Sequence, residues 1–331
     1  MSELARPDLT IVIPVLNDWA SCRVLLSRIN ELNIPEINRV SVVIVDDGSI
    51  EPAPDTLLLE PLAGFISGIS VVELFCNVGH QRAIALGLAS RAEIATKDFI
   101  VVMDSDGEDK PDDIGPLIRA LYANPGAIVV AERAGRSEGT GFRVGYAAYQ
   151  TLFRLLIGKR IDFGNFCALS SISLHRLIRS PDTWNHLAAA ILRSRIPVTR
   201  VAVRRGVRYT GTSSMNIPAL VAHGLSAFAV FSDSVFSRLF LFANSLGGIA
   251  VLGGIVVLIL RFYTDMAIPG WATITFGVFI NLFMQSLLLC LLGAVQLLST
   301  RGHVPAQPAA MVPLFVRRIR TIKIQEKADD T

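Results

Sequence analysis

Two long uncharged segments constrain the fold of this chain more than any other feature. Leu239–Leu260 and the longer Trp271–Leu298 contain no Asp, Glu, Lys or Arg. A helix over the first segment would be about 33 Å long, and the hydrocarbon core of a bilayer is about 30 Å thick. Uncharged apolar segments of this length are typical of membrane-spanning helices and not of helices in a soluble core. The sequence therefore predicts two spans, at about 239–260 and 271–298.

The charges around these segments predict their orientation. Only Arg261 and Asp265 are charged between the spans, whereas arginines precede the pair and follow it. Positive flanks favour the cytoplasmic side, so both termini are expected there, in a multi-pass protein of the cytoplasmic membrane. The chain opens on a short segment of mixed charge, so no secretory signal is expected.

Small and polar residues within the spans indicate helix contacts. Ala243, Gly247, Ala250 and Gly254 recur at helical spacing, which lets two helices approach closely in lipid. Asn281 and Gln285 lie one turn apart and are costly in hydrocarbon unless paired. We expect these two to face the interior of the bundle or another subunit, so a homo-oligomer is possible.

The spans divide the chain into four parts. We expect a domain over 1–210, an amphipathic juxtamembrane segment over 211–237, the spans over 238–299 and a basic tail over 300–331. The juxtamembrane segment has helically spaced apolar residues, as in helices that lie in a membrane interface. The tail either lies on anionic lipid or is disordered.

The first 210 residues read as an α/β domain. Short apolar runs rich in β-branched residues predict strands at 9–15, 40–45, 71–75, 99–103 and 127–131, with a later strand at 196–203. Helical patterns separate the first five runs. Alternation of this kind predicts a largely parallel sheet, with ligands at the carboxyl ends of its strands.

Acidic residues gather where the fourth predicted strand ends. Asp104 follows Met103 directly, and Asp106 and Glu108 follow at every second position. Carboxylates this close repel one another unless a cation lies between them, and hard oxygen ligands select Mg²⁺ or Mn²⁺, which usually also hold substrate phosphates. The alternative is a solvated acidic turn.

Other strand ends carry polar groups with a functional and an ordinary interpretation. Asp46 and Asp47 could hold a base or ribose, or form a simple turn. Gly79 permits a tight turn into a helix whose first turn, with Arg82, suits an anion; alternatively Arg82 is solvated. Arg133 and Arg143 lie in a Gly-rich stretch and could bind phosphate, or line a solvated loop.

Composition excludes some other classes. With 31 basic and 28 acidic residues, the net charge of +3 gives no reason to expect a nucleic-acid partner. The four cysteines are scattered without ligand spacing, so neither disulfides nor a zinc site is expected.

Taken in series, these motifs resemble the inverting family-2 nucleotide-sugar glycosyltransferases, and among them the polyprenyl-phosphate sugar transferases. The segments that carry the resemblance are P-V-L-N-D at 14–18, V-D-D-G-S at 45–49, N-V-G-H-Q-R-A at 77–83, M-D-S-D-G-E-D-K-P at 103–111, Arg133, and R-Y-T-G-T-S-S-M at 208–215. The two spans complete the pattern, which extends to about residue 300.

The resemblance implies a fold, a reaction and a set of site residues. The fold is a Rossmann-like glycosyltransferase A-type domain followed by an interfacial helix and two spans. The enzyme would transfer one sugar from a nucleotide-diphosphate sugar to a membrane polyprenyl phosphate, with inversion and with Mg²⁺ or Mn²⁺. The implied residues are Asp106, Arg133, Arg143 and Arg208 for catalysis; Pro14, Asn17, Asp18, Asp46, Asp47, Gly79, Arg82, Asp104 and Ser213 for substrate; and Asp104, Asp106 and Glu108 for the metal.

The chain departs from the family pattern at three places. Glu108 replaces a glutamine of the metal motif, Ser214 replaces a lysine, and Phe166 is followed by Cys167 where an arginine is expected. Arg204, Arg205 or Arg208 can replace the lysine. Two other functions remain open: transfer to a lipid hydroxyl, which would need a catalytic base, and a non-catalytic membrane scaffold that binds nucleotide sugars.

Overall fold

A computed structural model describes residues 6–54, 64–92, 98–133, 150–210, 217–264, 270–302 and 306–322. The chain divides into two compact units. The first contains residues 1–145, 161–230 and 305–331, and the second contains residues 146–160 and 231–304. The segment between the spans and the last nine residues lie outside the described part.

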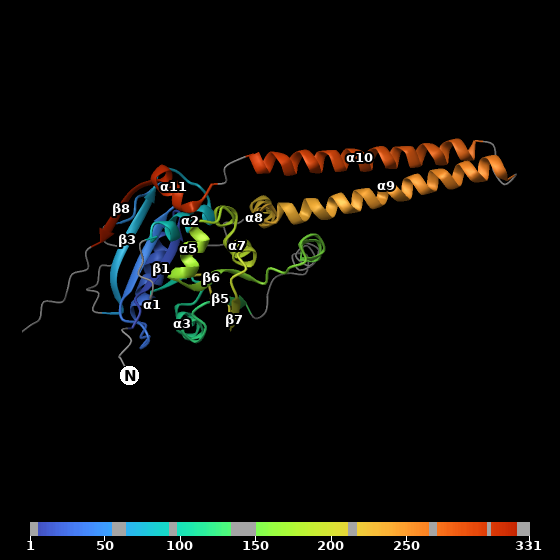
Figure 1. The fold of residues 1–331 in the computed structure, drawn as a ribbon. Helices are drawn as coiled ribbons and strands as arrows, with labels where there is room; N and C mark the ends of the chain where they lie inside the picture. The colour runs from blue at the N-terminus through green and yellow to red at the C-terminus, as the bar shows by residue number, and fades with distance from the viewer. Residues whose placement is uncertain are drawn as a thin grey trace, which may run out of the picture. The chain divides into compact units, whose positions relative to one another are not determined.

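The first unit is built on one eight-stranded sheet (Figure 1). Its strands are β1 (Leu9–Val15), β2 (Val40–Asp46), β3 (Ile66–Leu74), β4 (Phe99–Val102), β5 (Ile128–Arg133), β6 (Phe163–Ser170), β7 (Val198–Val203) and β8 (Val316–Ile322). The strand order is β7-β5-β6-β4-β1-β2-β3-β8. The α/β prediction is confirmed, and each predicted strand is present; β3 begins five residues before its predicted start at 71, and the other ends shift by two residues or fewer.

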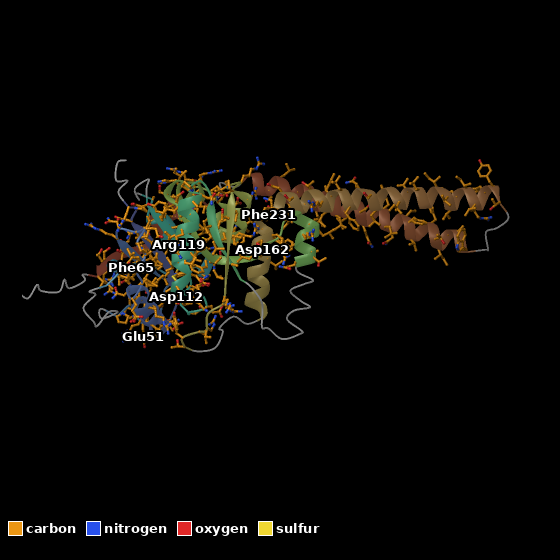
Figure 2. The ribbon with its side chains drawn as sticks, turned by 90° about the horizontal axis from the view of Figure 1, so that it is seen from below. Glu51, Phe65, Asp112, Arg119, Asp162 and Phe231 are labelled. Atoms are coloured by element: carbon orange, nitrogen blue, oxygen red, sulfur yellow. The ribbon has the colours of Figure 1, made fainter. Side chains whose placement is uncertain are left out.

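The sheet is mixed, which corrects the prediction of a largely parallel one. The central strands β4, β1, β2 and β3 pair in parallel. However, β6 is antiparallel to both β4 and β5, and β8 is antiparallel to β3. The sequence did not predict β6, because Asn165 lies within its apolar run and Asp162 directly precedes it. Asp162, labelled in Figure 2, instead pairs with Arg200 of β7 at 3.4 Å.

Helices cover both faces of the sheet. One face packs against α1 (Trp19–Asn30) and α3 (Ile114–Ala123), the latter preceded by the 3-10 helix η1 (Pro111–Asp113). The other face packs against α2 (His80–Ala89), α5 (Ser171–Ile178), α7 (Leu187–Arg193) and α11 (Pro308–Phe315). Alternate residues of β1 serve the two cores, since Ile11 and Ile13 lie in the first and Val12 in the second. This two-sided burial explains the uninterrupted apolar run of β1.

The segment after the spans returns to the sheet. Helix α11 and strand β8 follow the second span, and β8 becomes the edge strand next to β3. Arg318 donates two hydrogen bonds to the buried carboxylate of Glu73, at 2.6 and 2.9 Å. Residues 306–322 are thus a helix and a strand of the sheet, where the sequence predicted a tail that lies on lipid or is disordered.

The predicted juxtamembrane segment is not one helix. Helix α8 (Ile217–Val230) ends at Val230, and α9 (Ser232–Tyr263) begins two residues later. Residues 211–216 lie outside the described part of the chain. That α8 lies in a membrane interface stays a prediction.

The second unit contains two helices that are long and apolar enough to cross a membrane, α9 and α10 (Trp271–Gly302). Within the described part of the chain, their most apolar stretches are 28% and 6% buried, whereas the core helix of a soluble domain is mostly buried. The helices pack antiparallel, because Gly247 faces Ser286 while Gly254 faces Phe276. Ala243, Gly247, Ala250 and Gly254 are all buried, which confirms the predicted seam.

Asn281 and Gln285 lie outside the seam of this hairpin. Both side chains are exposed, and the Gln285 amide donates to Asn281 Oδ1 at 2.6 Å. The expectation that they face the interior of the bundle is therefore wrong for the α9–α10 pair. A contact with another subunit stays a prediction.

Candidate functional site

The acidic loop after β4 folds into a compact turn, and we call residues 104–109 the acid loop. The Asp104 N–H donates to Asp109 Oδ2 at 3.1 Å, and the Glu108 N–H donates to Asp106 Oδ1 at 2.9 Å. Gly107 has a φ of +89°, and a Cβ there would lie 2.8 Å from the ring of Tyr209. Only glycine fits this turn, because both the backbone conformation and the close ring exclude a side chain.

The loop after β7 covers the acid loop and brings two arginines to it. Arg208 Nε donates to Glu108 Oε1 at 2.9 Å, and Arg208 Nη2 lies 2.7 Å from Asp106 Oδ2. Arg205 Nη2 donates to Glu108 Oε2 at 2.6 Å. The Tyr209 N–H also donates to the Asp106 carbonyl at 2.9 Å. The structure thus joins Arg208 to the predicted acids although about 100 residues separate them.

The two acids respond to this setting in opposite ways. Burial raises the pKa of Asp106, and repulsion from Asp104 and Glu108 adds to the rise, which Arg208 only partly offsets. Burial also acts to raise the pKa of Glu108, but its hydrogen bonds to Arg205 and Arg208 outweigh burial and hold that pKa below the ordinary value. Glu108 is thus paired with two arginines and Asp106 with one, so the negative charge of Asp106 is compensated less fully.

The end of β2 forms a second acidic corner. Asp47 accepts hydrogen bonds from the backbone N–H groups of Val78 and Gly79, at 2.8 and 3.1 Å. Asp46 accepts from the Ser49 N–H at 2.9 Å. Burial raises the pKa of Asp47, and the two backbone donors oppose that rise. Asp47 thereby ties the end of β2 to the turn that begins α2.

The residues that follow β1 form hydrogen bonds with the loop that follows β2. Asn17 has a left-handed φ of +54°, its N–H donates to Ser49 Oγ, and its side chain accepts from the Ile50 N–H. Asp18 caps α1 by accepting from the Ser21 N–H at 3.2 Å, and Thr210 Oγ1 donates to it at 3.3 Å. Pro14 pairs with Val45 in the β1–β2 ladder. Thr210 brings the loop after β7 to this corner as well.

The first turn of α2 does not place every residue as predicted. Gly79 begins the turn with a φ of +92°. The guanidinium of Arg82 lies over the ring of Trp184, 5.5 Å from its centre, so its anion contact stays a prediction. His80 was not among the predicted site residues, yet its Nε2 atom lies 3.2 Å from Asp104 Oδ1.

His80 belongs to a hydrogen-bonded group that the sequence did not reveal. Asn165 Nδ2 lies 3.0 Å from His80 Nε2, and Asn165 Oδ1 accepts from Gln81. Partial burial acts to lower the pKa of His80, but the charge of Asp104 outweighs it and raises that pKa. The signal in the sequence was Asn165, a polar residue within the apolar segment that forms β6.

Three predicted residues cannot be placed beside these groups. Arg133 is the last residue of β5, but its side chain lies outside the described part of the chain. Arg143 and Ser213 fall wholly outside the described residues. Their roles stay predictions.

The donor set suits a divalent cation that a phosphate ligand also contacts. Among the described residues, no three His, Cys, Asp or Glu side chains converge as a ready metal-binding group. Asp104 and Asp106 nevertheless supply hard oxygens, and burial together with repulsion from Asp104 and Glu108 raises the pKa of Asp106, so a cation there would offset both costs. One or two carboxylates plus substrate phosphates are the usual protein environment of Mg²⁺. Glu108 is held by arginines, so its place as a ligand stays a prediction.

Known proteins are similar to this chain in sequence and in fold. Residues 10–176 match the family described as Glycosyl transferase family 2. The chain is 25% identical to the dodecaprenyl-phosphate galacturonate synthase of Rhizobium johnstonii over 77% of this chain and 76% of that protein. It is 31% identical to the undecaprenyl-phosphate 4-deoxy-4-formamido-L-arabinose transferase of Aeromonas hydrophila over 40% of this chain and 39% of that protein.

A solved structure supports the fold alone. Glucosyl-3-phosphoglycerate synthase from Mycobacterium tuberculosis, crystallised with Mn²⁺, uridine diphosphate and glucosyl-3-phosphoglycerate, superposes with a TM-score of 0.50 at 16% identity. The match covers 69% of this chain and 80% of that one. With the family match over half of the sequence, the predicted glycosyltransferase A-type fold is confirmed, and the chain is a glycosyltransferase that belongs to glycosyl transferase family 2.

Proposed function

We propose that this enzyme transfers one sugar from a nucleotide-diphosphate sugar to the phosphate of a membrane polyprenol. Two relatives whose names specify prenyl-phosphate sugar transfer support this acceptor class. The product would be a prenyl monophosphate sugar, and the nucleoside diphosphate would leave. Displacement by the lipid phosphate at the anomeric carbon would invert its configuration.

The corners at the ends of β1 and β2 are proposed to hold the nucleotide. Asp18, Asp46 and Asp47 lie at or just beyond the carboxyl ends of parallel strands, where α/β sheets bind their ligands. Asp47 is fixed by two backbone donors, so it is already oriented before a ligand arrives. Carboxylates in this position can accept hydrogen bonds from a base or a ribose.

The acid loop is proposed to hold the cation that neutralises the negative charge of the departing diphosphate. Asp104 and Asp106 would hold Mg²⁺ or Mn²⁺, which when bound neutralises negative charge as a Lewis acid. Arg208 contacts Asp106 and could move to a phosphate oxygen, since its guanidinium offers several donors. The site therefore concentrates cationic groups where negative charge develops.

The acceptor explains why the site needs no strong base. A lipid phosphate is already anionic near neutral pH, so it must be positioned and not deprotonated. Arg133, Arg143 and Arg208, with Ser213, are the proposed contacts. A hydroxyl acceptor would need a catalytic base, whereas the names of the two relatives in sequence specify a prenyl phosphate.

The α9–α10 hairpin is proposed to hold the enzyme at the cytoplasmic face of the membrane. A long prenol leaves the bilayer at high cost, about 0.8 kcal/mol per CH₂ exposed to water. The phosphate end must therefore meet the enzyme at the bilayer surface. Two apolar helices after the catalytic unit meet this requirement.

The observation that carries the proposal is the acid pair after β4 in a chain with membrane-length helices. We expect Asp106→Asn to lower the rate of sugar transfer by at least about a hundredfold, because the pair loses a charged ligand. The measurement is formation of labelled lipid product by purified protein, with circular dichroism to verify folding.

Asp112→Asn, on the exposed side of η1, is the matched control and should transfer at the normal rate. Full activity of the Asp106 variant, or of the unmodified enzyme in excess chelator, would refute the metal role.

A further inference from the structure

His80 Nε2 faces one group that accepts hydrogen bonds and one group that donates them. It lies 3.2 Å from Asp104 Oδ1 and 3.0 Å from Asn165 Nδ2. A ring nitrogen that carries a hydrogen can donate to the carboxylate, whereas one with a lone pair can accept from the amide. One nitrogen cannot do both. The neighbouring hydrogen bonds decide which role it takes.

The direction of these hydrogen bonds can be followed from a backbone group. The Leu187 N–H can only donate, and its partner at 2.8 Å is Gln81 Oε1. The other end of the Gln81 amide is therefore its NH₂ group, which donates to Asn165 Oδ1 at 3.0 Å. Asn165 must then present its own NH₂ group to His80. We call Leu187 N–H, Gln81, Asn165 and His80 the amide relay.

The end of the relay fixes the tautomer of His80. In the neutral ring, therefore, His80 Nε2 accepts from Asn165 and the imidazole proton lies on Nδ1. Asp104 Oδ1 then faces a lone pair and not an N–H. Two acceptors at 3.2 Å repel each other unless a positive charge relieves them. Asp104 alone would favour a proton on Nε2, so the relay and Asp104 oppose one another.

We infer that Gln81 and Asn165 are positioning residues that hold His80 in the Nδ1–H tautomer and so leave Asp104 to a divalent cation. This inference rests on the cation of the proposed function. His80 would otherwise donate to Asp104 and compete with that cation. The relay reaches the acid loop from β6 and from the start of α7, two elements that carry none of the residues predicted for the metal.

A substitution two groups away from the ring tests this inference. Gln81→Glu keeps an acceptor for the Leu187 N–H but replaces the NH₂ group by an oxygen. Asn165 must then turn its amide to donate to that oxygen, which presents Oδ1 to His80 and draws the ring proton to Nε2. Asn165→Asp presents an oxygen to His80 directly. Gln307→Glu, at the exposed cap of α11, is the matched control with the same change in charge.

The first readout is the position of the ring proton. The full-length protein, labelled with ¹⁵N-histidine in detergent with Mg²⁺, is measured at a fixed pH at which imidazole is neutral; His80→Gln identifies the signal among the five histidines. We expect Nε2 to be unprotonated in the unmodified chain and in the control, and protonated in both relay variants. An unchanged tautomer in both folded variants would overturn the inference.

The second readout is Mn²⁺ binding, followed by electron paramagnetic resonance without any donor. Each relay variant adds a negative charge, which by simple attraction would tighten Mn²⁺ binding. The relay predicts the opposite, a dissociation constant about threefold to tenfold higher, because His80 now donates to Asp104. Tighter binding would contradict the inference. A chain that makes no lipid product yet shows the tautomer switch would refute the proposed transfer alone, so the two failures differ.

Discussion

At the scale of single residues, the acid loop divides its carboxylates between two tasks. Glu108 is paired with Arg205 and Arg208, while Asp106 retains a raised pKa despite Arg208. Glu108 is thus neutralised by two arginines, whereas Asp106 shares one of them and is the carboxylate that we propose as a cation ligand. Glu108 stands where the family's metal motif has a neutral glutamine. The two arginines neutralise the extra negative charge of Glu108, which explains how a glutamate can occupy this position.

The Glu108 pairs should make stability depend on pH with a defined sign. The pKa of Glu108 is lowered in the folded state, so its pairs stabilise the protein above the unfolded pKa and lose that effect as the pH falls through the folded pKa. We expect Arg205→Met to lower the free energy of unfolding by about 1 kcal/mol or less at pH 7, and by much less at pH 3. Urea unfolding in detergent at both pH values measures this.

Arg204→Met is the control, since Arg204 is exposed and adjacent. An equal loss at both pH values in the Arg205 variant would mean that packing, and not charge, explains the effect.

The sequence predicted site residues where they directly follow a strand. Asp46, Asp47, Asp104 and Asp106 come at strand ends, and parallel strands bring their ends together. His80, Gln81 and Asn165 could not be predicted as a group. Their contact depends on β6 running antiparallel beside β4, which long-range pairing decides and local pattern does not.

At the scale of elements, β8 was the main difference between expectation and structure. Its sequence is rich in arginine, and the alternation of Val316, Ile319 and Ile322 with charged residues is weak. A basic terminal segment usually suggests disorder or a membrane surface. The strand forms because Glu73, buried on β3, requires a cationic partner and β3 otherwise has an open edge.

The Glu73–Arg318 pair should therefore stabilise the sheet edge. We expect Arg318→Met to lower the free energy of unfolding by about 2 to 3 kcal/mol, because a buried carboxylate loses its bidentate partner and, among the described residues, keeps Arg320 at 3.6 Å. Chemical unfolding of the full-length protein in detergent measures this.

Arg317→Met, one residue earlier on the same strand, should change stability by less than about 0.5 kcal/mol. Equal effects of the two substitutions would show that Glu73 does not depend on Arg318.

At the scale of the whole molecule, one sheet contains strands from both sides of the hairpin. Strands β1 to β7 precede α9 and α10, and β8 follows them. A chain that crosses a membrane between two strands of one sheet must cross it an even number of times, which two spanning helices satisfy. This pairing supports the same-side placement of both flanks independently of the charges that predicted it.

Single cysteines introduced into a chain without native cysteines would test this topology. We expect Ser2→Cys and Thr331→Cys to react with a membrane-impermeant maleimide only from the cytoplasmic side, and Pro269→Cys only from the opposite side. Labelling of all three from one side would mean that the hairpin does not cross the membrane.

The most direct test of the central claim is the mass of the lipid product. Purified full-length enzyme is incubated with undecaprenyl phosphate, Mg²⁺ or Mn²⁺ and a panel of nucleotide-diphosphate sugars, and lipids are analysed by mass spectrometry. Our account predicts, for at least one donor, a product whose mass equals undecaprenyl phosphate plus one sugar residue, with release of the nucleoside diphosphate. A product that carries a sugar phosphate, or no lipid product from any donor by folded enzyme, would contradict it.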